Sequence, residues 1–236
     1  MLYGQVDERI KFIISMGKEI NLLKNYPRTK RNIFDREKQK SEEDRRVARK
    51  FQKDFFDGDR RHGYGGFFYN SKFWQPVIPD LREYWNLSSD SSILDVGCAK
   101  GFMLYDFSKL IPGIHLRGID ISEYAIDNSI SEIKKFVQVA DAKKLPFPDN
   151  SIDGIWNVGV MEHFTLEDIE KILAEFYRVL KKEGRIILFW PMAYAPYEIF
   201  LNIVEGIYNF MLAPRNCNAS ACIEQSIRQP NFQSLE

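Results

Sequence analysis

Apolar residues occur along this chain in two alternating patterns. Between residues 92 and 190, short runs of strand-favouring residues are separated by longer stripes with helical spacing. The runs lie at 92–96, 115–120, 136–140, 154–157 and 185–190. The stripes lie at 102–110, 123–135 and 165–183. This alternation predicts an α/β fold with a doubly wound, mostly parallel sheet.

The residues before this region predict a helical extension. Residues 1–25 have the apolar spacing of a helix, and residues 26–40 are basic and predict a solvated linker. A second helix is expected over 41–58, because Ser41 and Asp44 have the spacing of a capping box. After a stretch dense in glycine and aromatic residues, a third helix leads into the first strand.

The C-terminal end departs from the alternating pattern. Residues 197–212 predict one more helix, too short and too polar to span a membrane. The remaining tail has no strand-like period, so the last strands of the sheet are not visible. An unpaired strand edge favours association, and we expect a homo-oligomer or a partner chain that completes the sheet. The predicted units are an N-terminal cover segment (1–75), a sheet domain (76–213) and an irregular tail (214–236).

Composition narrows the functional classes. The chain has 33 basic and 33 acidic residues, so its overall charge gives no reason to expect nucleic-acid binding. Its three cysteines and three histidines have no metal-ligand spacing, and we expect no metal site and reduced thiols. Charged residues interrupt the apolar N-terminus, so no secretory signal is predicted and a cytoplasmic, non-membrane protein is expected.

The loop after the first strand carries the strongest chemical signal. Asp95 ends the strand, small residues follow at Gly97, Ala99 and Gly101, and a helix begins directly afterwards. Small residues let a ligand approach the backbone, and a helix N-terminus offers free N–H groups. The charge of Asp95 lies where a dinucleotide's pyrophosphate would have to sit, which disfavours NAD or FAD. A ligand with a cationic, hydroxyl-rich end fits better.

The run from Asp95 to Gly101, Asp-Val-Gly-Cys-Ala-Lys-Gly, resembles motif I of the class I S-adenosylmethionine (SAM)-dependent methyltransferases. The family pattern is D/E-x-G-x-G-x-G, from which Ala99 departs at the middle glycine. Asp120, Asp141 and the stretch after the fourth strand follow in the family's order. The resemblance covers about residues 90–190. It implies a Rossmann-like fold and SAM as the cofactor.

The resemblance also implies roles for individual residues. The acid and small residues of motif I would hold the methionine side of SAM, and the acid after the second strand would accept from the ribose hydroxyls. The residues after the third strand would meet the adenine, and those ending the fourth strand would lie near the sulfonium. In chain order these cofactor-binding residues are Asp95, Gly97, Ala99, Gly101, Asp120, Ile121, Asp141, Ala142, Asn157 and Val158.

The acceptor side of the site is expected from two stretches. Glu162 and His163 follow the fourth strand, and His163 has a pKa suited to a general base. Many methyl transfers need no base, so a structural role for His163 stays open. The glycine- and aromatic-rich stretch 57–74 precedes motif I, where the family commonly has a segment that covers the cleft. Its candidates for the acceptor pocket are Arg60, Tyr64, Tyr69 and Trp74.

These observations predict a methyltransferase that moves the SAM methyl group to an O, N or C atom of a small molecule. One alternative is an RNA or protein methyltransferase that uses the basic region 24–50, which would make binding strongly salt-dependent. Another is a catalytically inactive SAM-fold subunit that binds or regulates a partner. A nicotinamide-dependent enzyme is a more distant alternative.

Overall fold

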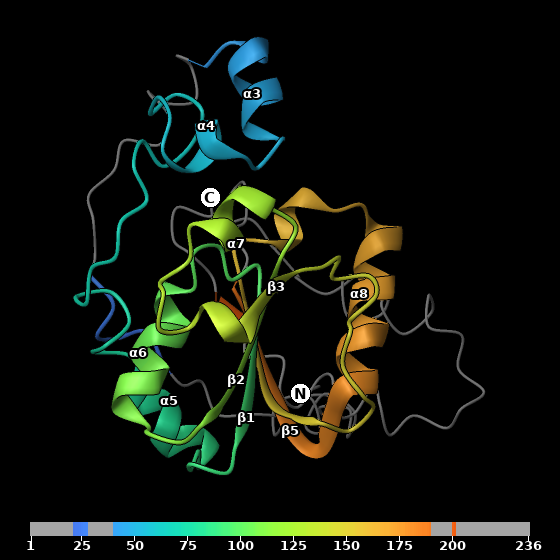
Figure 1. Cartoon of the computed structure of the whole chain (residues 1–236). Helices are drawn as coiled ribbons and strands as arrows, with labels where there is room; N and C mark the ends of the chain where they lie inside the picture. Colours follow the sequence, from blue (N-terminus) through green and yellow to red (C-terminus); the bar gives the residue numbers. More distant parts are fainter. Residues whose placement is uncertain (1–20, 28–39, 190–199, 202–236) are drawn as a thin grey trace, which may run out of the picture.

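The computed structural model of the chain describes residues 21–27, 40–189 and 200–201 (Figure 1). Six strands form one sheet in the order β3-β2-β1-β4-β5-β6. The first five run parallel, and β6 pairs antiparallel to β5. The strands are β1 Ser92–Val96, β2 His115–Asp120, β3 Val137–Val139, β4 Ile152–Val158, β5 Leu180–Phe189 and β6 Phe200–Leu201. The predicted Rossmann-like α/β fold is therefore confirmed.

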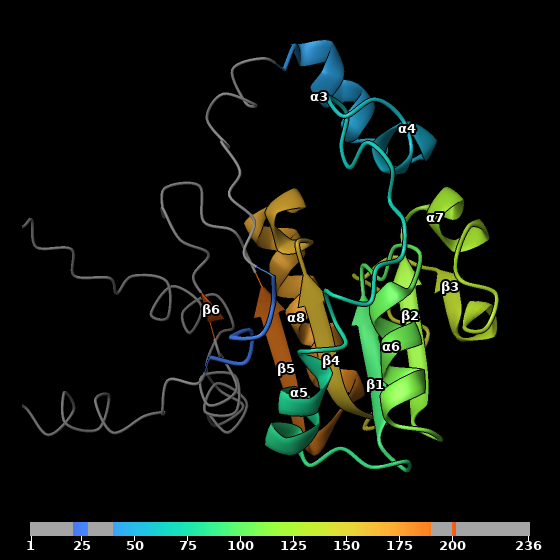
Figure 2. The same cartoon turned by 90° about the vertical axis from the view of Figure 1, so that its left-hand side faces the viewer.

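Helices cover both faces of the sheet (Figures 1 and 2). Helices α5 (Ile78–Trp85) and α6 (Phe102–Leu110) lie on one face, and α8 (Leu166–Val179) lies on the other. Short elements complete this part of the chain: α7 (Glu123–Asp127) and the 3-10 turns η1 (Lys134–Phe136) and η2 (Met161–His163). Parallel strands need such crossover connections, and burial on both faces explains the continuous apolar runs in the sequence.

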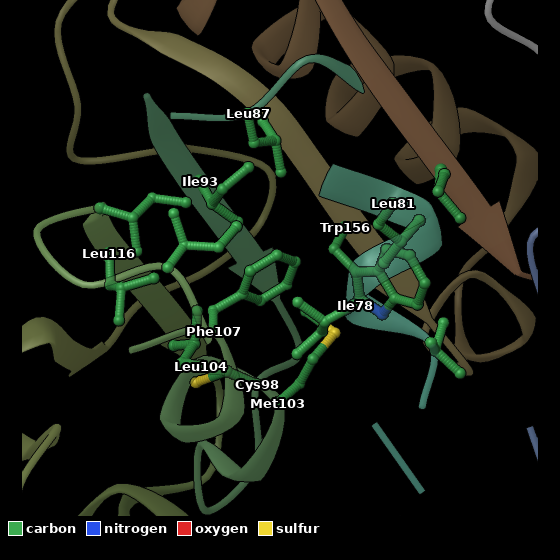
Figure 3. Close-up of a cluster of buried hydrophobic side chains, with 14 of the residues drawn as sticks. Ile78, Leu81, Leu87, Ile93, Cys98, Met103, Leu104, Phe107, Leu116 and Trp156 are labelled. Atoms are coloured by element: carbon green, nitrogen blue, oxygen red, sulfur yellow. The ribbon is translucent and has the colours of Figure 1, made fainter. Parts of the chain in front are cut away.

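The core is divided by the sheet into two hydrophobic clusters. Ile93 of β1 packs with Leu81 of α5 and Phe107 of α6 in one cluster (Figure 3). Leu94, the next residue of β1, packs with Phe176 of α8 in the other. Successive side chains of a strand point to opposite faces, so all five residues of β1 are buried. This rigid centre fixes the place where β1 ends and motif I begins.

Two predicted helices are shorter in the structure than the sequence pattern indicated. Helix α7 ends at Asp127 and does not continue to 135, because Ile133 is fully buried and packs against Gly101. Helix α8 ends at Val179 and does not continue to 183. Strand β5 begins at once, and its register with β4 shifts between Ile152 and Gly154. The packing of Ile133 in the first case, and the pairing of β5 with β4 in the second, outweigh the local preference for a helix.

The predicted helix over 41–58 is two helices. Helix α3 (Glu42–Ala48) begins with the expected capping box, in which the Ser41 hydroxyl accepts from the Asp44 N–H at 3.1 Å. The chain then turns at Phe51, whose φ of 51° is left-handed, before α4 (Lys53–Phe56). This turn directs the Phe51 ring against His163, 4.8 Å away between ring centroids. The α3–α4 unit thus lies beyond the carboxyl ends of the strands (Figures 1 and 2).

The outer parts of the chain correct two further predictions where they are described. Residues 22–25 form turns and not the end of a helix, and Leu22 belongs to the buried cluster that includes residues of α5. Residues 200–201, predicted to be helical, pair with β5 and form a sixth strand that the sequence did not show. The rest of the helices predicted at 1–25 and 197–212, most of the basic linker and the tail 214–236 lie outside the described residues. Among the residues that are described, no helix has the length and apolar character to cross a membrane.

Candidate cofactor and acceptor site

The loop from Gly97 to Gly101 has a backbone that suits glycine at both ends. Gly97 has a φ of 80° and Gly101 a φ of 74°. A Cβ atom would lie 2.2 Å from Val160 Cγ2 at Gly97, and 2.3 Å from Ile133 Cδ1 at Gly101. Both positions therefore require a residue without a side chain. Ala99, between them, has a φ of 49°, which is unfavourable for alanine.

Asp120 joins this loop to the start of α7. One of its carboxylate oxygens accepts from the Ala99 N–H at 2.8 Å, and the other accepts from the Ser122 N–H at 2.8 Å. Burial raises the pKa of Asp120, while these backbone donors oppose the rise. Each carboxylate oxygen keeps a second lone pair, so adjacent hydroxyl groups of a ligand can still donate to it.

Asp95 lies beside Asp120 at the carboxyl end of the next strand. Its side chain is 5% exposed and has no hydrogen-bond partner among the described residues. Burial, helped by the negative charge of Asp120, raises the pKa of Asp95 to about 8. A buried acid without a partner is costly when ionised, and a positively charged ligand group would remove that cost.

Exposed apolar side chains lie beside these acids. Ile121 directly follows Asp120 and is 56% exposed, and Val139 of β3, which is paired with Asp120, is 44% exposed. Asp141 follows β3, is exposed, and accepts from the Lys143 N–H at 2.9 Å. Ala142 is buried. Ile121 and Val139 offer an apolar surface for a flat ring, and the carboxylate of Asp141 lies just beyond the end of β3.

The two residues predicted near the sulfonium differ in their surroundings. Asn157 is fully buried, and its Nδ2 donates to the Val96 carbonyl at 3.1 Å, so its side chain links β4 to β1. Its Oδ1 has no partner among the described residues. Val158, the next residue, is half-buried and packs on the cluster shown in Figure 3. The Asn157 side chain therefore shapes the end of the sheet.

Glu162 and His163 lie in the turn after β4. Both side chains are exposed to solvent. Nearby protein still desolvates them in part, which raises the pKa of Glu162 and lowers the pKa of His163. The imidazole nitrogens have no hydrogen-bond partner among the described residues, and the ring packs edge-on against Phe51. A largely neutral imidazole can accept a proton at neutral pH.

A continuous row of aromatic rings runs from His163 across the cover segment to α6. Neighbouring ring centroids in this aromatic row are 4.3–5.3 Å apart, and the contacts are edge-to-face, tilted or stacked. After His163 its members are Phe51, Phe55, Tyr64, Phe67 and Phe102. Through Phe51 and Phe55, the row links the post-β4 turn to the glycine- and aromatic-rich stretch.

The predicted acceptor residues have different surroundings in the structure. Tyr64 belongs to the aromatic row and is 42% exposed. Tyr69 donates from its hydroxyl to Asp106 in α6 at 2.5 Å, and Trp74 packs edge-on against Trp156 in the core. The guanidinium of Arg60 donates to the Tyr64 carbonyl. Tyr69 and Trp74 thus attach the cover segment to the sheet domain, whereas Tyr64 remains accessible.

Residues 94–188 match a protein-family model described as a methyltransferase domain. This region is therefore similar to methyltransferase domains. The match begins inside β1 and ends inside β5, so it contains motif I, Asp120, Asp141 and the post-β4 turn.

Curated proteins similar to this chain include two that are named for different acceptors. The chain is 34% identical over 107 residues to an uncharacterized protein of Haemophilus influenzae, covering 42% of each chain. It is 34% identical over 124 residues to demethylmenaquinone methyltransferase of Symbiobacterium thermophilum, covering 49% of this chain and 48% of that one. It is 35% identical over 100 residues to a sterol 24-C-methyltransferase of Gibberella zeae, covering 39% and 25%. The chain therefore spans less than half the length of these relatives.

Similar solved structures include the YcgJ protein of Bacillus subtilis, with a TM-score of 0.41 and 27% identity over 48% of this chain and 50% of that one. Another is geranyl diphosphate C-methyltransferase of Streptomyces coelicolor in complex with Mg²⁺, geranyl diphosphate and S-adenosyl-L-homocysteine. Its TM-score is 0.39, with 20% identity over 47% of this chain and 45% of that one.

Proposed function

We propose that the methyltransferase domain binds SAM and transfers its methyl group to an O, N or C atom of a small-molecule acceptor. The observation that carries this proposal is the buried carboxyl group of Asp95, which has no partner among the described residues and lies next to a loop open to close backbone approach. SAM has an ammonium and a sulfonium group, and either cation would stabilise the ionised form of Asp95.

The chemistry of the residues present supports this proposal at the methionine, ribose and adenine parts of the cofactor. Asp95 with Gly97, Ala99 and Gly101 would hold the methionine part, and Asp120 would accept from the ribose hydroxyls. Ile121, Asp141 and Ala142 would contact the adenine, with Val139 adding apolar surface that the sequence did not single out. When bound, SAM supplies a methyl group on a strong electrophile. The task of the protein is then to orient the acceptor in line with that methyl group.

The acceptor is proposed to lie between the post-β4 turn and the aromatic row. His163, whose pKa is lowered by partial burial, is proposed to take a proton from the acceptor, and Glu162 to bind a polar group on it. Tyr64 and other rings of the row would supply flat apolar contact area, and Arg60 would contact a polar group. Two named relatives act on largely apolar molecules, a demethylmenaquinone and a sterol, which supports a small-molecule acceptor.

The RNA or protein alternative receives little support from the described part of the basic region. The guanidinium groups of Arg45 and Arg46 in α3, and of Arg49 at its C-cap, pair with acidic residues in the first turn of α3 at 2.7–3.8 Å. These pairs reduce the positive charge available to phosphate groups. Location in the cytoplasm and a homo-oligomer or partner chain at the sheet edge stay predictions, as does the three-unit division of the chain.

The test is a calorimetric titration of SAM into the purified chain, followed by an assay for S-adenosylhomocysteine with a panel of quinones, sterols, phenols and amines. Binding that Asp120→Ala abolishes, together with turnover of one acceptor, is the expected result. Binding without turnover of any acceptor would favour the inactive subunit. A chain that melts cooperatively but does not bind SAM would contradict the proposal.

A further inference from the structure

Asp57 is held by three donors from three different parts of the chain. Its Oδ2 accepts from the Lys100 ammonium at 2.6 Å and from the Tyr124 hydroxyl at 2.6 Å. Its Oδ1 accepts from the Phe67 N–H at 2.9 Å. Lys100 belongs to the glycine loop, Tyr124 to α7, and Asp57 and Phe67 to the cover segment. Burial alone would raise the pKa of Asp57, but these hydrogen bonds lower it to about 2.

Lys100 holds both ends of the 57–67 loop. Its ammonium also donates to the Phe67 carbonyl at 3.0 Å, and its side chain lies among the aromatic rings of Phe68 and Tyr124. Lys100 is 6% exposed, and a charge buried to this extent is costly unless it is paired. The contact therefore favours one arrangement of the loop, in which Asp57 and Phe67 both meet the ammonium.

Asp57 and Asp120 connect the same two elements from different sides. Asp120 accepts from Ala99 in the glycine loop and from Ser122 at the start of α7. Asp57 accepts from Lys100, the residue after Ala99, and from Tyr124, two residues after Ser122. A ligand bound at Asp120 would therefore act on the two elements that supply the side-chain donors of Asp57.

We propose that Asp57 and Lys100 are positioning residues that couple an occupied cofactor site to the placement of the 57–67 loop. The loop contains Tyr64 and Phe67 of the aromatic row, and the Tyr64 ring packs against Phe55 just before the loop. The coupling therefore sets the surface that is proposed to face the acceptor. This inference rests on the proposed function, because it requires the glycine loop to bind SAM or its product. It assigns a role to Asp57, Lys100 and Tyr124 that the sequence did not indicate.

The experiment is hydrogen–deuterium exchange of the whole chain, read on peptides covering 62–68, with and without S-adenosylhomocysteine. The Tyr64 and Gly66 N–H groups donate to the Phe55 and Phe56 carbonyls, so their exchange reports closure of the loop. In the wild type we expect the ligand to slow this exchange. In Asp57→Asn we expect exchange about tenfold faster and no response to the ligand, while calorimetry shows the ligand still bound.

Asp59→Asn is the matched control. Asp59 lies in the same loop, pairs with Arg61 at 3.1 Å and does not contact the glycine loop. The exchange pattern of Asp59→Asn and its response to the ligand should match those of the wild type. Tyr124→Phe removes only one of the donors to Asp57, so its exchange rate should lie between those of the wild type and Asp57→Asn. It replaces Asp57→Asn as the test variant if Asp57→Asn does not melt cooperatively. Given an acceptor, Asp57→Asn should change KM for that acceptor more than KM for SAM.

Each result separates this inference from the proposed function. Fast exchange and a lost ligand response in Asp57→Asn, with Asp59→Asn unchanged, support the coupling. Exchange in a folded Asp57→Asn or Tyr124→Phe that matches the wild type in both states contradicts it. If the wild type binds no S-adenosylhomocysteine, the proposed function fails and the coupling fails with it. Faster exchange of the unliganded Asp57→Asn would then report only a structural contact.

Discussion

Asp95 makes a quantitative prediction about protons that accompany cofactor binding. Because burial and the charge of Asp120 raise its pKa to about 8, Asp95 is protonated in the free protein at pH 6.5. A cationic ligand needs the ionised form, so binding must release this proton. Ionising a group with a pKa of about 8 at pH 6.5 costs about 2 kcal/mol, equivalent to about 30-fold in affinity.

The assay is calorimetric titration of SAM at pH 6.5 in two buffers with different ionisation enthalpies, which gives the number of protons released. We expect about one proton per SAM, because the ligand's amino group is already protonated at this pH. Asp95→Asn, which keeps the shape of the side chain, should bind more weakly and release no proton. Tight binding by the wild type with no proton release at pH 6.5 would refute the reasoning.

The same pKa shift gives the sign of a stability change. Asp95 in the folded chain binds a proton between about pH 4 and pH 8, where the unfolded chain has lost it. Its contribution to the free energy of unfolding therefore decreases as pH rises through this range, by at most about 1.4 kcal/mol per pH unit. Denaturant titrations should show a smaller decrease for Asp95→Asn than for the wild type, since the amide does not titrate.

Three further predictions concern the loop, a helix end and the post-β4 turn. Gly97→Ala should lower the free energy of unfolding by about 3 kcal/mol, because the new Cβ would collide with Val160. Ala99→Gly should raise the free energy of unfolding by about 0.5 kcal/mol, because glycine adopts the left-handed backbone conformation at position 99 without strain. Chemical denaturation measures both changes. Thr165→Ala should cost about 1 kcal/mol and lower the melting temperature, because the Thr165 hydroxyl caps α8 by accepting from the Asp168 N–H. Once an acceptor is known, the pH–rate profile should rise with a midpoint below 6.5, and His163→Gln should lack this rise; an identical profile would show that His163 is structural.

The elements of the central sheet were predictable because their signals are local. The bounds of β1 and β2 match the runs at 92–96 and 115–120, and α6 begins directly after Gly101 as expected. A buried parallel strand needs only a short apolar run, and a glycine loop needs only small residues. The acids that end or follow the strands could be placed from the same information, since the carboxyl ends of parallel strands meet at one edge of a sheet.

The errors occurred where distant residues decide local structure. The helix expected over 41–58 breaks at Phe51, whose ring meets His163, and the helix expected to 135 ends early because Ile133 packs on Gly101. The contact between Lys100 and Asp57 joins residues 43 positions apart, and neither residue has a sequence signal that names the other. Tyr69 could be recognised as important, but only the position of Asp106 shows that its hydroxyl is an attachment point.

Among the described residues, neither hydrophobic cluster of the core draws a member from residues 41–73. That stretch is attached to the domain by a few polar contacts, by the contact of Phe51 with His163, and by ring contacts with aromatic residues of α6 and α7. Its sequence can therefore change without disturbing the packing of the sheet, provided that the partners of Lys100 and Asp106 and the rings that contact α6 and α7 are kept. Such an arrangement is modular, and we expect that exchanging this stretch between related proteins would change the proposed acceptor surface and leave the sheet domain intact.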